Sequence, residues 1–127
     1  MAKPIGKEIK SECIQLRQAG GGYDHCWAVH GESEKLRHAL TLTDRQSGRV
    51  LEVLTTEPGI QVYTGNFLYG TIGRNGQEYQ NFAGVAIEAE PYPNSPNQKN
   101  FPSVQLLPGE QYRQTTIYRF AVADSGQ

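Results

Sequence analysis

The sequence predicts an all-β fold. Fourteen glycines and seven prolines divide the chain at short intervals. The runs between them are rich in Val, Ile, Leu, Thr and Tyr, and they are too short for helices. Turn signals such as Arg45-Gln46-Ser47-Gly48 and Leu107-Pro108-Gly109-Glu110 separate these runs. The spacing of glycine and proline, the composition of the runs between them and the turn signals therefore all predict strands joined by tight turns.

The expected strands follow from these runs, with boundaries good to about two to four residues. They cover residues 12–17, 25–30, 36–43, 49–55, 60–64, 84–89, 103–107 and 111–123. The last is the clearest, because Tyr118, Phe120 and Val122 fall on one face and Arg119 on the other. Residues 32–38 could form one helical turn, but their glycine and threonine flanks favour a loop that enters a strand.

Length and charge limit the organisation and the partners. A chain of 127 residues with 37% hydrophobic residues predicts one domain, residues 1–127, with a modest core. Twelve basic and thirteen acidic residues give a net charge of -1, and neither sign is clustered, so neither nucleic acid nor membrane is expected as a partner. Since no apolar run is long enough for a signal segment or a membrane span, a cytoplasmic protein is expected.

Cysteines and histidines give no sign of a metal or a hydrolytic triad. Cys13 and Cys26 lie outside any CxxC pair and have no histidine at ligand spacing, so two reduced thiols are expected. No serine or cysteine stands in a nucleophile elbow that could use an Asp-His pair. His30 and His38 are interpreted as structural histidines.

Two carboxylates end the strand at 84–89. Glu88 and Glu90 are two residues apart, so extended geometry places them on one face, ahead of a proline-rich loop. Either both lie on a solvated face, or one of them serves as an acid or base in a concave site.

Polar and aromatic residues form two further candidate sites. Asp24, within Tyr23-Asp24-His25 and preceded by three glycines, could accept hydrogen bonds from sugar hydroxyls; the alternative is an ordinary turn with a capping Asp and a core Trp27. Gln61 and Asn66 could line a cleft, or they could satisfy a loop.

Four segments of the chain together carry a family resemblance. They read GGYDH, SGRVLEVLTTEPGIQVYTGNFL, AIEAEPYPNSPNQKNFPSVQLLPGEQY and TTIYRFAV. In this order they resemble the successive blocks of the aldose 1-epimerase, or galactose mutarotase, family over about residues 4–123. The resemblance implies a partial antiparallel β-sandwich, the C-terminal portion of the galactose mutarotase-like supersandwich, whose cleft binds a hexose. It also implies an enzyme that interconverts α and β anomers by acid–base ring opening, with no cofactor and no metal.

The resemblance also assigns roles to residues. Glu88 matches the catalytic glutamate and would be the general base, while Asp24 and Gln61 match residues that bind the sugar. Glu90 departs from the family, which commonly has Gln there. The family's catalytic histidine, an Asn-Arg pair and a second histidine precede the matched blocks, and His25, His30 and His38 match none of them by motif.

Two consequences are expected. Without a positioned acid, the chain alone would lose most of the roughly 10²- to 10⁴-fold that such a group supplies. A partial sandwich also exposes sheet edges, which favours self-association or pairing with an N-terminal part.

The sequence therefore predicts a mutarotase that acts on galactose or glucose, or in the alternative a non-catalytic carbohydrate-binding β-sandwich. A hexose-6-phosphate epimerase is disfavoured because the arginines that would bind the phosphate are scattered along the chain.

Overall fold

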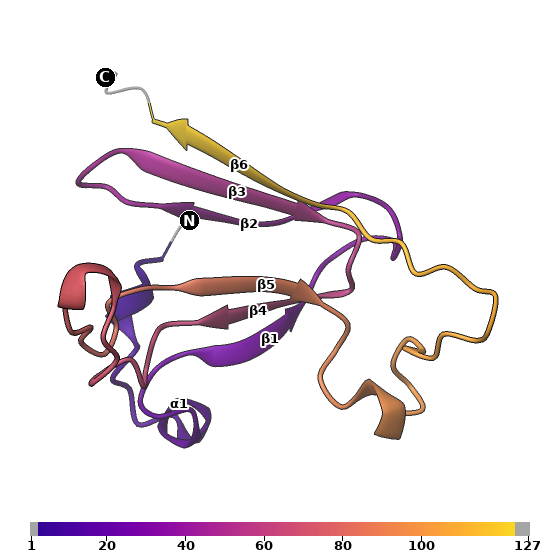
Figure 1. Cartoon of the computed structure of the whole chain (residues 1–127), viewed down its shortest axis with the longest axis horizontal. Helices are drawn as coiled ribbons and strands as arrows, with labels where there is room; N and C mark the ends of the chain where they lie inside the picture. The colour runs from indigo at the N-terminus through magenta and orange to yellow at the C-terminus, as the bar shows by residue number, and fades with distance from the viewer. Residues whose placement is uncertain (1–2, 124–127) are drawn as a thin grey trace. The chain divides into compact units, whose positions relative to one another are not determined.

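The computed structural model describes residues 3–123 (Figure 1). Within that range the elements, in chain order, are η1 (Ile5–Lys7), α1 (Ile14–Gln18), β1 (Asp24–Ala28), β2 (Arg37–Thr43), β3 (Arg49–Thr55), β4 (Gly59–Tyr63), η2 (Arg74–Gly76), β5 (Ala86–Glu90), η3 (Ser95–Asn97) and β6 (Thr116–Val122). The α-helical residues of this range are confined to α1. The predicted all-β class is confirmed.

One three-stranded sheet has the order β2-β3-β6. Both pairings are antiparallel, with Leu42 opposite Leu51 and Leu51 opposite Phe120. Because β3 has a partner along each edge, it is the most buried strand of this sheet, and Val53 and Thr55 have no exposed surface.

The other sheet has the order β1-β4-β5. Two backbone bonds show that β1 and β4 run antiparallel: Val29 N–H donates to Pro58 O at 2.8 Å, and Thr64 N–H donates to Tyr23 O at 3.0 Å. The central strand β4 begins with buried Gly59 and Ile60, and β1 lies at an edge of the sheet. Polar side chains on β1 can therefore be open to solvent while β4 anchors them.

The strand predicted at residues 12–17 is wrong, because this segment contains α1. Its residues from Gln15 to Ala19 are mostly unbranched good helix formers, and Ala19 N–H donates to Gln15 O at 3.1 Å. Gly20 and Gly21, with φ of 83° and 84°, end the helix. Leu16 is the buried residue of this helix.

The predicted strand at 103–107 is also wrong, and the one predicted at 111–123 begins late. Residues 103–107 have no strand partner among the described residues, and β6 begins only at Thr116. Pairing toward β3 starts where Thr56 N–H donates to Thr115 O at 3.0 Å. A period-two pattern identifies residues suited to a strand, but only a neighbouring strand supplies the ladder.

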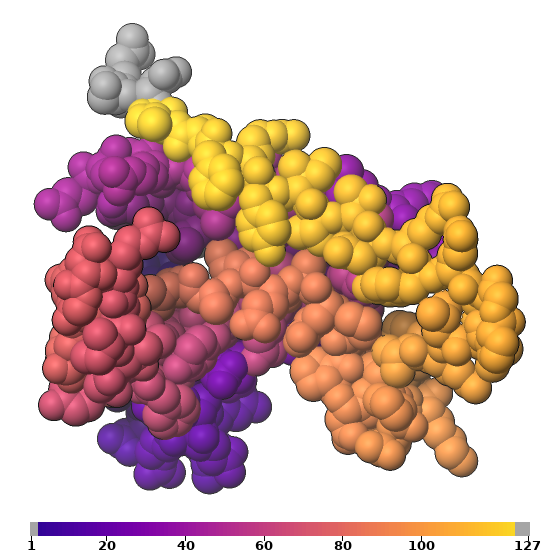
Figure 2. Space-filling view, in the orientation of Figure 1, coloured from indigo at the N-terminus to yellow at the C-terminus, as the bar shows by residue number. Residues whose placement is uncertain are grey.

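The alternation predicted for β6 is present, yet its apolar side is exposed. Tyr118, Phe120 and Val122 are 44%, 78% and 70% exposed. The yellow spheres of β6 are uncovered on the face seen in Figure 2. β6 is thus an edge strand with an open apolar side.

The described chain divides into two compact units. One contains residues 3–27 and 61–88, and the other contains residues 28–60 and 89–123. The single domain expected for residues 1–127 stays a prediction. In the described part of the chain, no helix has both the length and the apolar character that a membrane span requires.

Candidate functional site

Asp24 and Gln61, which the sequence assigned to sugar binding, lie in contact on neighbouring strands. Asp24 begins the edge strand β1, and Gln61 is in the middle of β4. The Gln61 Nε2 group donates a hydrogen bond of 2.7 Å to Asp24 Oδ1. The carboxylate of Asp24 is exposed, so its second oxygen remains open toward solvent.

The other end of the Gln61 amide is an unpartnered acceptor. Its Oε1 is buried and has no hydrogen-bond partner among the described residues. Buried side-chain oxygens are normally satisfied by protein, water or ligand. Because Nε2 is committed to Asp24, Oε1 is oriented to accept a hydrogen bond from a further group, such as a hydroxyl.

Glu88 lies on β5, the strand on the other side of β4. Its side chain is exposed and makes no hydrogen bond or ion pair within the part of the chain that the structure describes. The three predicted residues therefore come from the three successive strands of one sheet. Asp24 and Gln61 are hydrogen-bonded, whereas Glu88 is bonded to neither.

Asn66, the second amide that could have lined a cleft, is instead part of the loop structure. It is 1% exposed, and its Nδ2 donates to Ala19 O at 2.6 Å and to Tyr23 O at 3.1 Å. Thr64 Oγ1 donates to Asn66 Oδ1 at 2.6 Å. Gly22 must be glycine here, because a Cβ would collide with Asn66 Oδ1 and Thr64 Oγ1. The loop alternative is thus the correct one for Asn66.

Three rings on β1 and just before it form an aromatic cluster. The ring centroids of Tyr23, His25 and Trp27 are separated by 6.2 Å, 5.8 Å and 6.0 Å, and the ring planes are tilted by 56° to 72°. Trp27 is 44% exposed, so it is not the core residue of the alternative interpretation.

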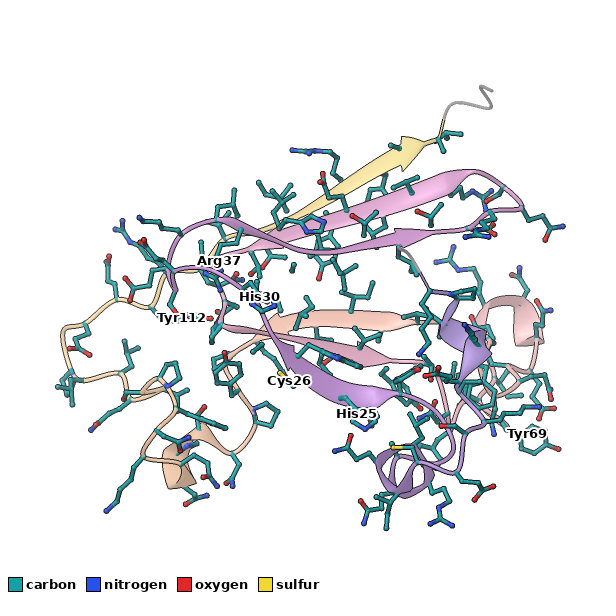
Figure 3. The ribbon with its side chains drawn as sticks, turned by 180° about the vertical axis from the view of Figure 1, so that it is seen from behind. His25, Cys26, His30, Arg37, Tyr69 and Tyr112 are labelled. Atoms are coloured by element: carbon teal, nitrogen blue, oxygen red, sulfur yellow. The ribbon has the colours of Figure 1, made fainter. Side chains whose placement is uncertain are left out.

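Sequence reasoning missed a contact made by His25. The backbone N–H of Asp24 donates to His25 Nδ1 at 2.9 Å, and Figure 3 shows His25 projecting from β1. The only sequence signal for this contact is that the histidine directly follows the aspartate.

The remaining histidines and the cysteines have ordinary surroundings. His38 Nε2 lies 2.8 Å from Thr41 Oγ1, which agrees with a structural histidine, and His30 is exposed. Neither Cys13 nor Cys26 is in a disulfide. Across residues 3–123 no group of three His, Cys, Asp or Glu side chains could hold a metal ion.

A second polar feature, also missed from the sequence, lies in the unit formed by residues 28–60 and 89–123. Glu57 is 5% exposed, and its Oε1 accepts a hydrogen bond from the Tyr112 hydroxyl. This bond to a carboxylate, together with partial burial, raises the pKa of Tyr112 to about 12. Both residues line a cavity of about 910 Å³. Arg37, next to Tyr112 in Figure 3, donates from NH2 to Glu57 O at 2.7 Å.

Comparison with known proteins decides the family. A family model described as aldose 1-epimerase matches residues 1–119. The chain belongs to the aldose 1-epimerase family. Galactose mutarotase from Bos taurus is 47% identical over 103 residues, which cover 80% of this chain and 30% of that protein. Aldose 1-epimerase from Escherichia coli is 37% identical over 121 residues, 94% of this chain and 34% of that protein.

A solved structure supports the same assignment for the fold. The crystal structure of the GalM/aldose epimerase homologue from C. elegans matches with a TM-score of 0.72 and 28% identity, over 80% of this chain and 30% of that one. The chain therefore spans about 30% of the length of such relatives. Its strands belong to the fold of this family.

Proposed function

We propose that this chain supplies the general base and two sugar-binding groups of an aldose 1-epimerase that interconverts the α and β anomers of a hexose. The observation that carries the proposal is the Asp24–Gln61 pair, hydrogen-bonded at 2.7 Å with the Gln61 Oε1 acceptor still unpartnered. An exposed carboxylate beside an amide acceptor suits two adjacent hydroxyl donors, as a pyranose presents them. Membership of the family supports the choice of a hexose.

In the proposed reaction, Glu88 takes the proton of the anomeric hydroxyl while an acid protonates the ring oxygen. The C1–O5 bond then breaks, the resulting aldehyde rotates, and ring closure on its other face gives the other anomer. Asp24 and Gln61 hold the remaining hydroxyls during these steps. The acid is a histidine in the family, and none of this chain's histidines is assigned that role.

The preferred hexose and the cellular location are also proposed. Galactose is proposed as the preferred hexose because several relatives carry the name galactose mutarotase. A cytoplasmic location is proposed because neither Cys13 nor Cys26 is in a disulfide.

The alternative is a carbohydrate-binding β-sandwich that does not catalyse. One observation favours it: Asp24 and Gln61 are already paired, whereas the exposed Glu88 has no partner within residues 3–123 to orient it. Binding and catalysis must therefore be measured separately.

The decisive experiment follows the optical rotation of fresh α-D-galactose with the chain alone and with imidazole added as an external acid. We expect acceleration that Glu88→Gln reduces by roughly 10²- to 10⁴-fold, the usual worth of a positioned base. The matched control is Glu90→Gln, the same chemical change two residues along β5, which should keep the rate within a few-fold. Sugar binding without acceleration of the change in optical rotation, both with and without imidazole, would favour the non-catalytic alternative.

A further inference from the structure

We infer that His25 is a positioning residue: it holds the backbone of Asp24 so that the Asp24 carboxylate meets a sugar hydroxyl. The inference rests on the proposed function, because Asp24 needs a fixed position only if it binds the sugar.

The first step concerns the backbone of β1. Tyr23 directs both its N–H and its C=O toward β4, since its N–H donates to Thr64 Oγ1 at 2.9 Å and its O accepts from Thr64 N–H at 3.0 Å. Successive residues of a strand direct their backbone groups to opposite edges. The N–H of Asp24 therefore faces the edge of the sheet, where no strand within residues 3–123 accepts its hydrogen bond.

His25 provides the missing acceptor. Its Nδ1 accepts the Asp24 N–H at 2.9 Å, so Nδ1 carries a lone pair and the ring proton is on Nε2. A histidine protonated on both nitrogens could not make this bond. The contact thus requires one tautomer of the neutral ring.

The imidazole ring is itself held in place. Tyr23 and Trp27 both contact it, with ring centroids 6.2 Å and 5.8 Å away, and they lie 6.0 Å from each other, so the three rings form a compact triangle. Such tilted contacts restrict the rotation of the ring and keep Nδ1 aligned with the Asp24 amide.

Asp24 is consequently held at two points. His25 fixes the main chain, and Gln61 Nε2 fixes Oδ1 at 2.7 Å. The remaining oxygen, Oδ2, has no partner within the described chain and is the one available to a ligand. Pre-organised groups bind more tightly because less conformational freedom is lost on binding.

Two substitutions separate the acceptor from the ring. His25→Asn places an amide oxygen close to the position of Nδ1 but removes the ring, whereas His25→Phe keeps an aromatic ring and removes the acceptor. The dissociation constant of D-galactose is measured by calorimetric titration of the full chain and each variant. We expect His25→Phe to weaken binding about tenfold, the worth of one ordinary hydrogen bond, and His25→Asn to remain within about threefold. If His25 served only ring packing, the order of the two variants would be reversed.

A measurement without any substitution guards against variants that fold poorly. The nitrogen-15 resonances of the neutral His25 ring in the unchanged chain should show the proton on Nε2 and not on Nδ1. A proton on Nδ1 would overturn the inference.

The binding outcomes distinguish this inference from the function on which it rests. If the unchanged chain does not bind galactose, the proposed function fails and the inference falls with it. If the unchanged chain binds but His25→Phe binds equally well, or both variants lose equally, the inference alone fails. Asp24→Asn is the reference for complete loss of the carboxylate.

Discussion

Gln61 and Asn66 are five positions apart, and their amide groups have opposite surroundings. Asn66 is 1% exposed, and both polar atoms of its side chain are hydrogen-bonded, to Ala19, Tyr23 and Thr64. Gln61 is only partly buried, is bonded to one exposed carboxylate and keeps an unpartnered oxygen. A folded interior requires its polar groups to be hydrogen-bonded, whereas an unpartnered acceptor beside an exposed carboxylate leaves a hydrogen bond for a further group. The same amide group thus serves the structure of the loop at Asn66, and at Gln61 we propose that it serves binding.

The largest effect on stability is expected at Asn66. In Asn66→Ala, the Ala19 carbonyl loses its donor, the Thr64 hydroxyl loses its acceptor on Asn66, and the Tyr23 carbonyl keeps only the bonds from Thr64, all inside a buried loop. We expect the free energy of unfolding to fall by about 3 kcal/mol, measured by urea denaturation. Asn97→Ala, at an exposed asparagine bonded to the Asn94 side chain, is the control and should change it by less than about 0.5 kcal/mol. Equal losses of unfolding free energy in Asn66→Ala and Asn97→Ala would contradict a structural role specific to Asn66.

Gln61 should show the opposite profile. Gln61→Ala removes the acceptor and the clamp on Asp24, so galactose affinity should fall about tenfold. The free energy of unfolding should change by less than about 1 kcal/mol, because the main partner of Gln61 is exposed to water. Calorimetric titration and urea denaturation measure the two quantities, with Gln80→Ala as an exposed control. A large loss of stability with unchanged galactose affinity would show that Gln61, like Asn66, serves the structure and not binding.

Glu57 is intermediate between Asn66 and Gln61, because its side chain is buried but its hydrogen-bond donor, the Tyr112 hydroxyl, belongs to an exposed residue. Tyr112→Phe removes the hydroxyl that donates to Glu57, and we expect a loss of about 1 kcal/mol of stability near pH 7. The pKa of Tyr112 is raised from 10.0 to about 12 in the folded chain. The stabilisation is therefore fully present below about pH 10 and is lost as the pH rises through about 12.

Denaturation of the unchanged chain and Tyr112→Phe at a series of pH values checks this, because the difference between them should shrink across that range. Tyr69→Phe, at a tyrosine that is 69% exposed, serves as the control and should show no such convergence. A difference that stays constant to pH 12 would exclude the hydroxyl as its source.

Sequence reasoning succeeded where a strand's partners are local in the chain. β2 and β3 flank a hairpin turn and were predicted nearly to the residue, at 36–43 and 49–55 against Arg37–Thr43 and Arg49–Thr55. It failed at 12–17, where helix-forming residues and two following glycines outweighed a strand-like reading. It also failed at 103–107, where pairing depends on a neighbour that no local pattern specifies.

The site was predicted through family motifs rather than through periodicity. Those motifs brought Asp24 and Gln61 together, and the structure joins them by a hydrogen bond. The roles of Asp24, Gln61 and Glu88 remain predictions. The contacts of His25 and of the Glu57–Tyr112 pair were not predictable, because each depends on the local path of the backbone or on residues 55 positions apart.

The uncovered side of β6 has a consequence for the behaviour of the chain in concentrated solution. Phe120 and Val122, 78% and 70% exposed, form an apolar surface on an edge strand that favours association with other molecules. The formal charge of -1 and the isoelectric point near 6.3 provide little electrostatic repulsion to keep molecules apart. Mildly acidic buffers therefore bring the colloidal stability of the chain to its minimum, and alkaline buffers of low salt keep it dispersed.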